Sequence, residues 1–349
     1  MSEVRENPLG VDGFEFVEFA APDASLLHKL FGQMGFHPTA RHLEYDITLY
    51  KQGHINFLVN EQPDSFAAEF AREHGPCCTG FALRVEDRDE AFDSTVDKGA
   101  VPVKDDFGKA LKVPMIEGIG GSVLYLTDDR DGSVWKDEYH LIEGADPEPE
   151  GFGLSFIDHL THNVFHGNMD EWADFYSRLF GFYEVRYFDI KGQQTGLTSR
   201  AMTSPTGAIS IPINQSSDPK SQINEYLDEY KGEGVQHIAL YTENVYQTVE
   251  AMHKSGIDFL DTPDTYYEII DKRIPEHDED LERMRKNRIL MDADEETGQK
   301  LLLQIFTKAN IGPIFFEIIQ RKGNKGFGEG NFTALFESIE LDQMRRGVL

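Results

Sequence analysis

The sequence has little cysteine. Its two cysteines among 349 residues, Cys77 and Cys78, are adjacent, so they make a poor disulfide and cannot cross-link a chain of this size. We interpret them as two small buried hydrophobic residues rather than as a redox pair. This usage favours a reducing compartment, and we expect a cytoplasmic protein.

Long apolar runs are also missing. No segment approaches the roughly 18 consecutive apolar residues that a membrane span requires. The first residues include Glu3 and Glu6 and no apolar run, which is not typical of a secretory signal. The sequence therefore predicts no membrane association and no export.

Basic residues are few. Lys and Arg number 33 against 62 Asp and Glu, which gives a formal net charge of −29 at pH 7. Nucleic acids and anionic membranes bind to patches of Lys and Arg, so neither is an expected partner. A small anionic substrate would need a local cation to recruit it. The apolar fraction of 40% is that of an ordinary globular protein, and the length is sufficient for two domains.

What the sequence does contain is an internal repeat. A strand-like run around Leu83 is followed by a helical stretch that ends at Gly99, and the same relation holds between Leu240 and Gly256. Both intervals are 16 residues long. Each glycine occupies the position of a left-handed helix cap. The spacing therefore predicts two related units.

The starts of the two units agree as well. Strand-like runs at 13–19 and 155–162 each lead to an amphipathic helix. The apolar stripes of these helices are Leu26, Leu27, Leu30 and Phe31 in the first half, and Trp172, Phe175, Tyr176 and Leu179 in the second. The polar, Pro- and Gly-rich segment 144–153 is typical of a linker between residues 1–143 and 154–349. We expect a duplicated α+β fold.

Histidines distinguish the second unit from the first. His237 aligns with Gly80, and His159 aligns approximately with Phe16. The alternative for each histidine is a hydrogen-bonded core or surface residue. Two imidazoles at matching strand positions of one unit favour metal ligation. His162 is interpreted as structural, because positions i and i+3 on a strand face opposite ways.

An acidic third ligand is predicted in the last strand-like run. Glu317 is the single carboxylate inside the β-branched and aromatic run 312–321, where an unpaired charge is costly. The alternative is a salt bridge to a residue such as Arg321. Two neutral imidazoles and one carboxylate on three strands form the facial triad typical of non-haem Fe(II) oxygenases. Zinc hydrolases that use the same ligands usually carry a His-Glu-x-x-His helix, which is absent.

At these residues the sequence resembles the 4-hydroxyphenylpyruvate dioxygenase family of the vicinal oxygen chelate superfamily. The similarity covers nearly the whole chain and is densest in four segments, 157–164, 234–239, 316–321 and 326–332. It implies a fold of tandem duplicated βαβββ modules, with an open barrel-like sheet in each half and a C-terminal lid helix. The first half would be structural and the second catalytic.

The resemblance also implies an activity. A homodimer or homotetramer would use Fe(II) to convert 4-hydroxyphenylpyruvate and O₂ to homogentisate and CO₂, in tyrosine and phenylalanine catabolism. Positions implied to hydrogen-bond the substrate or organise its pocket are Ser199, Asn214, Gln222 and Gln304. Positions implied to pack around or contact the substrate are Phe306, Phe315, Phe327, Gly328, Phe332 and Phe336.

The residues themselves support part of this assignment. Gln304 interrupts an apolar strand and shares a face with Phe306, so an amide and an aromatic ring would line one pocket. The alternatives are an amide bonded to neighbouring backbone and, for Asn214, a turn residue at a strand end. Phe332, Leu335, Phe336 and Ile339 form an apolar stripe, either of a lid or of a helix that simply packs on its domain.

Three rival functions stay open. A 4-hydroxymandelate synthase would use the same substrate and metal but hydroxylate the benzylic carbon. A metal-free binding protein of the superfamily would not need all three ligands. A metal-dependent isomerase or lyase of the superfamily would turn over without O₂.

Overall fold

The computed structural model describes residues 5–130, 132–191, 196–294 and 298–331. The first half of the chain forms β1 (Gly13–Ala20), α1 (Ser25–Gln33), β2 (His37–His42), β3 (Ile47–Gln52), β4 (Ile55–Asn60), α2 (Phe66–His74), β5 (Cys77–Arg84), α3 (Arg88–Asp97), β6 (Met115–Glu117), η1 (Ile119–Gly121), β7 (Val123–Thr127), α4 (Ser133–Glu138) and β8 (Tyr139–Leu141). The second half forms β9 (Leu154–Asn163), α5 (Met169–Phe180), β10 (Tyr183–Lys191), β11 (Gly196–Thr203), β12 (Ser210–Gln215), α6 (Gln222–Tyr230), β13 (Gly234–Thr242), α7 (Val245–Ser255), α8 (Asp264–Glu268), α9 (Ile270–Arg273), α10 (Leu281–Asn287), β14 (Leu290–Ala293), β15 (Leu301–Phe306) and β16 (Phe315–Lys322).

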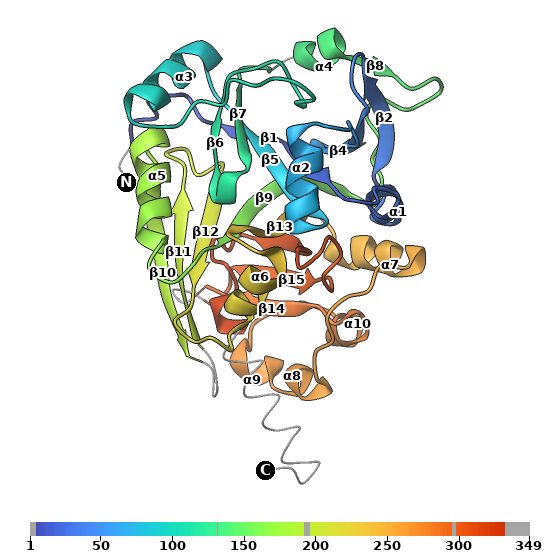
Figure 1. Ribbon diagram of the computed structural model, residues 1–349. Coiled ribbons are helices and arrows are strands. Elements are labelled where there is room, and N and C mark those ends of the chain that lie inside the picture. Colours follow the sequence, from blue (N-terminus) through green and yellow to red (C-terminus); the bar gives the residue numbers. More distant parts are fainter. Residues whose placement is uncertain (1–4, 131, 192–195, 295–297, 332–349) are drawn as a thin grey trace.

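Each half forms one curled eight-stranded sheet (Figure 1). The strand orders are β6-β7-β5-β1-β4-β3-β2-β8 and β10-β11-β12-β9-β13-β16-β15-β14. Strand β1 pairs in parallel with β4 and antiparallel with β5, and β9 pairs in the same two ways with β12 and β13. The prediction of a duplicated α+β fold is confirmed.

The βαβββ module is visible within the sheets. In β9-α5-β10-β11-β12 the fourth strand returns to lie beside the first, and β13-α7 with β14-β15-β16 repeats this order. The first half begins with the same module, β1-α1-β2-β3-β4. Paired modules join through their antiparallel first strands, so those two strands lie at the centre of each sheet.

Glycines lie at the ends of three helices that the sequence predicted. Gly181 caps α5 with φ of 73°, and Gly256 caps α7 with φ of 97°. Gly99, just after α3, has φ of 92°. This left-handed backbone is accessible to glycine without the Cβ clash that other residues suffer. Within the described residues no helix is both long and apolar enough to cross a lipid bilayer.

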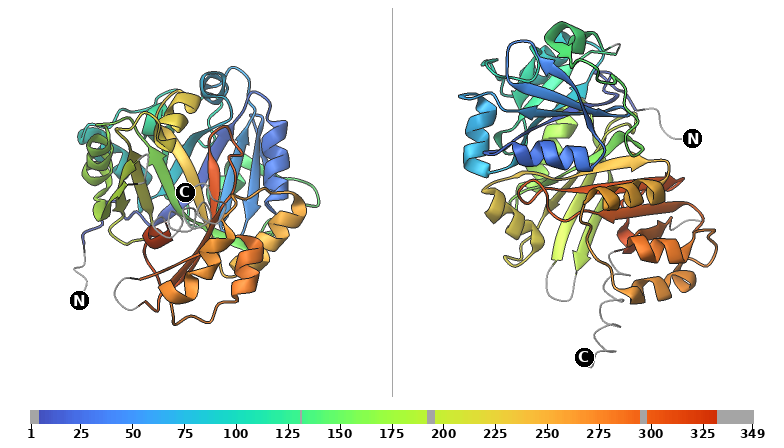
Figure 2. Two further views of the ribbon diagram at one scale, coloured as in Figure 1. Left: turned by 90° about the horizontal axis from the view of Figure 1, so that it is seen from below. Right: turned by 90° about the vertical axis from the view of Figure 1, so that its right-hand side faces the viewer.

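The two halves pack directly against each other (Figure 2) and share a continuous hydrophobic core. Phe57 of β4 and Phe316 of β16 are in contact across the halves, with ring centroids 5.9 Å apart. The His74 ring of α2 also hydrogen-bonds the Tyr230 carbonyl oxygen of α6, at 2.7 Å. Tight packing of this kind holds the second sheet on a rigid base.

A second apolar cluster belongs to the first half alone. It lies against the side of the sheet opposite the shared core and is formed by Phe16, Ala40, Ile47, Leu49, Leu58, Ala82, Ala110, Leu111, Val113, Met115, Val123, Tyr125, Val134 and Tyr139. In the first half this side of the sheet is therefore filled by apolar side chains. No corresponding apolar cluster is found among the described residues of the second half.

Two β-bulges recur at matching positions of the halves. In β1 and β9 the extra residues are Glu15 and Asp158, because the register skips them. In β5 and β13 the extra residues are Thr79 and Gln236. A bulge re-aims side chains that would otherwise alternate between the two faces of a sheet. The central strands therefore carry the same local distortion twice.

The predicted C-terminal helix falls on residues 332–349, which lie outside the described residues. Phe332 and Phe336 belong to this segment, so their assignment to the substrate pocket stays a prediction.

Candidate metal centre

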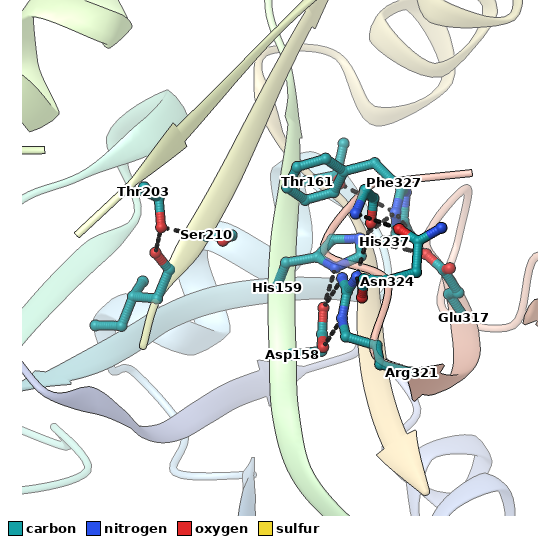
Figure 3. Close-up of polar contacts among 12 residues, drawn as sticks. Asp158, His159, Thr161, Thr203, Ser210, His237, Glu317, Arg321, Asn324 and Phe327 are labelled. Atoms are coloured by element: carbon teal, nitrogen blue, oxygen red, sulfur yellow. Dashed lines mark hydrogen bonds and ion pairs between the residues drawn. The ribbon is translucent and has the colours of Figure 1, made fainter. Parts of the chain in front are cut away.

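Three side chains predicted to bind a metal converge in the second half (Figure 3). His159 of β9, His237 of β13 and Glu317 of β16 come from three neighbouring strands. His159 Nε2 lies 3.3 Å from Glu317 Oε2, and His237 Nε2 lies 3.5 Å from the same oxygen. The two Nε2 atoms are 3.4 Å apart. Among the described residues this is the one such group of three His, Cys, Asp or Glu ligands.

The strand register explains why the three side chains meet. Ala239 of β13 lies directly between His159 on one neighbouring strand and Glu317 on the other. Its methyl group is small, so it leaves space between the imidazole and the carboxylate. His237 is two residues from Ala239 on the same strand and therefore faces the same side.

The separations suit one shared ion. Protein ligands lie about 2.0–2.2 Å from a first-row divalent metal, which places neighbouring ligand atoms about 3 Å apart. The three observed separations, 3.3, 3.4 and 3.5 Å, are close to this value. The residues fit a metal held by two imidazoles and one carboxylate.

Electrostatics in the metal-free site reflect the same proximity. Burial alone would lower the pKa of His159, but hydrogen bonds to Asp158 and Glu317 outweigh it and raise the pKa to about 9. Burial would raise the pKa of Glu317, but contacts with His159 and His237 lower it to about 2. Burial lowers the pKa of His237, against the opposing effect of Glu317. The carboxylate is thus ionised and ready to bind a cation.

Each ligand histidine is held by the residue before it. His159 Nδ1 donates to Asp158 Oδ1 at 2.8 Å, and His237 Nδ1 donates to Gln236 Oε1 at 3.0 Å. Both acceptors are the bulge residues described above. With a proton on Nδ1, a neutral imidazole presents the lone pair of Nε2 to a metal, so binding at His159 displaces the second proton that this ring holds in the metal-free site. Thr161 Oγ1 also lies 3.0 Å from His237 Nε2.

Arg321 forms no ion pair with Glu317, so the salt bridge given as the alternative is not made by this arginine. Its guanidinium donates instead to both oxygens of Asp158, from Nε and Nη2 at 2.7 Å each. Sequence analysis missed both Asp158 and its arginine partner. A regular strand would turn Asp158 away from His159, and only the bulge brings the two side chains together.

Aromatic rings predicted to contact the substrate surround the histidines. Phe315 stacks on His237 with centroids 4.9 Å apart, and Phe306 approaches the same ring at 6.3 Å. Phe327 meets His159 edge-on at 5.5 Å. These three phenylalanines are partly buried and form an apolar wall beside the metal ligands.

Gln304 lies on the same side of the sheet. It is two residues from Phe306, which pairs directly with Glu317. The Gln304 side chain is buried, and its Oε1 has no hydrogen-bond partner among the described residues. Gly328 packs against it, since a Cβ added at Gly328 would lie 2.1 Å from Oε1. A buried amide oxygen without a partner is costly, which is typical of a ligand-binding position.

The other predicted polar residues lie farther along the sheet. Ser199 and Asn214 are buried and sit opposite each other on β11 and β12. Asn214 Nδ2 donates to Asn163 Oδ1 at 3.3 Å, which extends this polar row to β9. Gln222 is exposed at the first position of α6. His162, interpreted as structural, contacts the Tyr176 hydroxyl at 2.7 Å on the far side of the sheet.

The corresponding place in the first half carries no such ligands. Matching the bulges sets Phe16 against His159, Gly80 against His237 and Tyr125 against Glu317. Tyr125 donates its hydroxyl to the buried Glu18 at 2.9 Å. Phe16 and Tyr125 belong to the apolar cluster of the first half. The first half therefore keeps the scaffold without the metal ligands.

Comparisons with known proteins agree with this geometry. Residues 5–140 match the family model "Hydroxyphenylpyruvate dioxygenase, HPPD, N-terminal", and residues 156–268 match "Glyoxalase/Bleomycin resistance protein/Dioxygenase superfamily". The chain is 52% identical to a 4-hydroxyphenylpyruvate dioxygenase from Pseudomonas aeruginosa, over 99% of this chain and 98% of that protein. It is 54% identical to a protein named hemolysin VllY from Vibrio vulnificus, over 98% of both chains.

A solved structure gives the same picture of the fold. A triple mutant of 4-hydroxymandelate synthase from Streptomyces coelicolor superposes with a TM-score of 0.79 at 24% identity. The match covers 96% of this chain and 100% of that one. It places the two curled sheets in the vicinal oxygen chelate fold.

Proposed function

The chain belongs to the 4-hydroxyphenylpyruvate dioxygenase family, and we propose that it converts 4-hydroxyphenylpyruvate and O₂ to homogentisate and CO₂ with one Fe(II) ion. His159, His237 and Glu317 would hold this ion. The convergence of these three buried ligands beside an aromatic wall is the observation that carries the proposal. Two imidazoles and a carboxylate are the ligand set of non-haem Fe(II) oxygenases.

Fe(II), when bound, supplies the Lewis acid that chelates the α-keto acid and the electrons that activate O₂. The protein's part is to place the substrate and to exclude water. Phe306, Phe315 and Phe327 would pack against the phenol ring. The amide of Gln304, with its unpaired oxygen, would orient a polar end of the substrate.

The more distant polar residues are also part of this proposal. Ser199, Asn214 and Gln222 would organise the pocket around the phenol or keto-acid end of the substrate. The row from Ser199 through Asn214 to Asn163 supports this for two of them, because all three side chains are buried and Asn214 hydrogen-bonds Asn163 across strands. Phe332 and Phe336 would also pack around the substrate, and the C-terminal helix would form a lid over the site. We also propose cytoplasmic localisation and a homodimer or homotetramer.

Product identification tests the proposal. The purified protein is loaded with Fe(II) without oxygen, mixed with 4-hydroxyphenylpyruvate and then exposed to O₂. We expect O₂ uptake and homogentisate as the chromatographic product. 4-Hydroxymandelate would show benzylic hydroxylation instead, and turnover without O₂ would show isomerase or lyase chemistry.

Matched variants connect this activity to the site. His237→Ala is expected to abolish O₂ uptake, because it removes one of three ligands. His253→Ala is the control, since it removes an exposed imidazole from α7 in the same half. Full activity of His237→Ala would refute the proposed metal site.

A further inference from the structure

We propose that Asp158, clamped by Arg321, positions His159 in the metal site and thereby sets how tightly the site holds its metal. This inference rests on the proposed function, because it assumes that His159 is a metal ligand. Neither Asp158 nor Arg321 belongs to the group of three candidate metal ligands. Their contacts are drawn in Figure 3.

The bulge in β9 is the first feature that allows Asp158 to position His159. The register passes from His159 opposite Ala239 to Ile157 opposite Leu240, so Asp158 has no partner on β13. Its carboxylate turns back and accepts from His159 Nδ1 at 2.8 Å. A carboxylate acceptor at Nδ1 fixes the imidazole tautomer and plane, and it raises the basicity of Nε2 toward a metal.

Arg321 is the second feature, because it holds the Asp158 carboxylate in place. Nε and Nη2 donate to the two oxygens of Asp158, in the fork-to-carboxylate geometry that is strongest between these groups. The Asp158 side chain is buried, and its two oxygens accept from Arg321 Nε, Arg321 Nη2 and His159 Nδ1. Both oxygens are therefore held as acceptors, one of them for His159.

The same arginine reaches the segment that follows β16. Its Nη1 donates to the Gly326 carbonyl oxygen at 2.7 Å and to that of Asn324 at 3.3 Å. Phe327, the next residue, lies with its ring 5.9 Å from the Arg321 guanidinium and 5.5 Å from the His159 ring. All three donor nitrogens are thus engaged, and they join β9, β16 and the aromatic wall.

The second ligand histidine has a weaker version of this support. His237 Nδ1 donates to the neutral amide of Gln236 at 3.0 Å. A neutral acceptor polarises an imidazole less than a carboxylate does. The carboxylate on His159 is therefore expected to contribute more to metal affinity than the amide on His237.

The first half supplies a matched control. Glu15 is the bulge residue at the position of Asp158, and it accepts from Arg84 Nη1 at 3.0 Å. The neighbouring residue, however, is Phe16 in place of His159. Glu15→Gln thus removes a buried carboxylate from the same kind of bulge without touching a metal ligand.

Metal binding measured by calorimetry tests the proposal. Co(II), which is stable in air, is titrated into the metal-stripped full chain at pH 7. We expect Asp158→Asn to weaken binding by about 10- to 100-fold, the range typical for residues that orient a ligand. Glu15→Gln is expected to bind as the wild type does. Wild-type affinity in Asp158→Asn, or an equal loss in Glu15→Gln, would overturn the proposal.

Two further measurements separate positioning from folding. The visible spectrum of bound Co(II) reports ligand arrangement, so at saturation it should shift in Asp158→Asn and not in Glu15→Gln. If Asp158→Asn fails to fold, Arg321→Lys decides, because it keeps the charge but loses the fork. Unchanged affinity in that variant would refute the clamp. Equal Co(II) affinity of the wild type and His159→Ala would instead refute the proposed metal site itself.

Discussion

Phe315 lies almost flat on His237, with ring centroids 4.9 Å apart and an angle of 21° between the planes. The two residues are directly opposite each other in the parallel pair of β13 and β16. This stack restrains the imidazole on one side, while Gln236 holds its Nδ1. The plane of His237 is therefore set by a ring and a hydrogen bond together.

Phe315→Leu should loosen that histidine. An aromatic pair contributes about 0.5–1.5 kcal/mol beyond area burial, so we expect Co(II) affinity to fall by roughly 2- to 10-fold. Phe316→Leu is the control, because Phe316 packs on Phe57 in the core and should lower stability without weakening metal binding. Calorimetry and thermal unfolding measure the two effects. Undiminished Co(II) affinity in Phe315→Leu would show that the ring stack does not contribute to metal binding.

Gly328→Ala should damage the pocket through two effects. Gly328 has φ of 81°, where a non-glycine residue costs about 1–2 kcal/mol, and its Cβ would lie 2.1 Å from Gln304 Oε1. We expect lower thermal stability and a higher KM for the keto acid. Gly207→Ala separates the effects, since Gly207 has φ of 74° and nothing within 4 Å of the added Cβ. Equal KM values in the two variants would exclude a role for the clash.

Glu18 gives the first half an unusual pH dependence. Burial raises the pKa of this carboxyl, and hydrogen bonds from Asn60 and Tyr125 offset only part of that effect. The folded state therefore holds the proton more tightly than the unfolded state, whose pKa is near 4.5. Stability from this group is present below pH 4.5 and is lost as pH rises through the folded pKa.

Glu18→Gln should remove this loss of stability with rising pH. The free energy of unfolding, measured with urea at several pH values, should fall less steeply in the variant than in the wild type as pH rises above 4.5. Glu117→Gln, which changes an exposed carboxyl of the same half, is the control. Parallel pH curves for Glu18→Gln and the wild type would contradict the prediction.

Substrate binding should require the metal. Among the described residues, no Lys or Arg forms a hydrogen bond or ion pair with the three ligands, and Arg321 is engaged by Asp158. The protonated His159 of the metal-free site is already paired with Asp158 and Glu317. The substrate carboxylate would therefore depend on the metal for its charge partner. We expect chelation to weaken 4-hydroxyphenylpyruvate binding at least about tenfold under anaerobic calorimetry, with recovery after Co(II) is added. Undiminished binding to the metal-free protein would reveal another cation in the pocket.

The helices were predictable because their signals are local. The apolar stripe of α5 and the glycine after it define one amphipathic helix, and equal spacings to Gly99 and Gly256 revealed the repeat. The order of strands in each sheet was not predictable from such spacing. It depends on contacts between residues far apart in the chain, and only the family resemblance supplied the βαβββ module.

The metal ligands were predictable because the two halves differ there. His159 and His237 stand where the first half has Phe16 and Gly80, and Glu317 is isolated in an apolar run. The residues that hold these ligands in place were not predictable from the sequence. Asp158 acts through a bulge that composition does not reveal, and its partner Arg321 lies 163 positions away.

The counterpart of the site in the first half, which has no metal ligands, has a consequence for protein engineering. A side chain at Gly80, where the other half has His237, would put its Cβ 2.5 Å from the Val123 carbonyl oxygen and 3.1 Å from the Tyr125 ring. Removing the tyrosine relieves the second collision but leaves the first, because the first is with backbone. Transplanting the ligands would therefore not create a two-centre enzyme unless β7 also moved away from β5. Asymmetry between the duplicated halves is built into the main chain, and reversing it requires more than exchanging side chains.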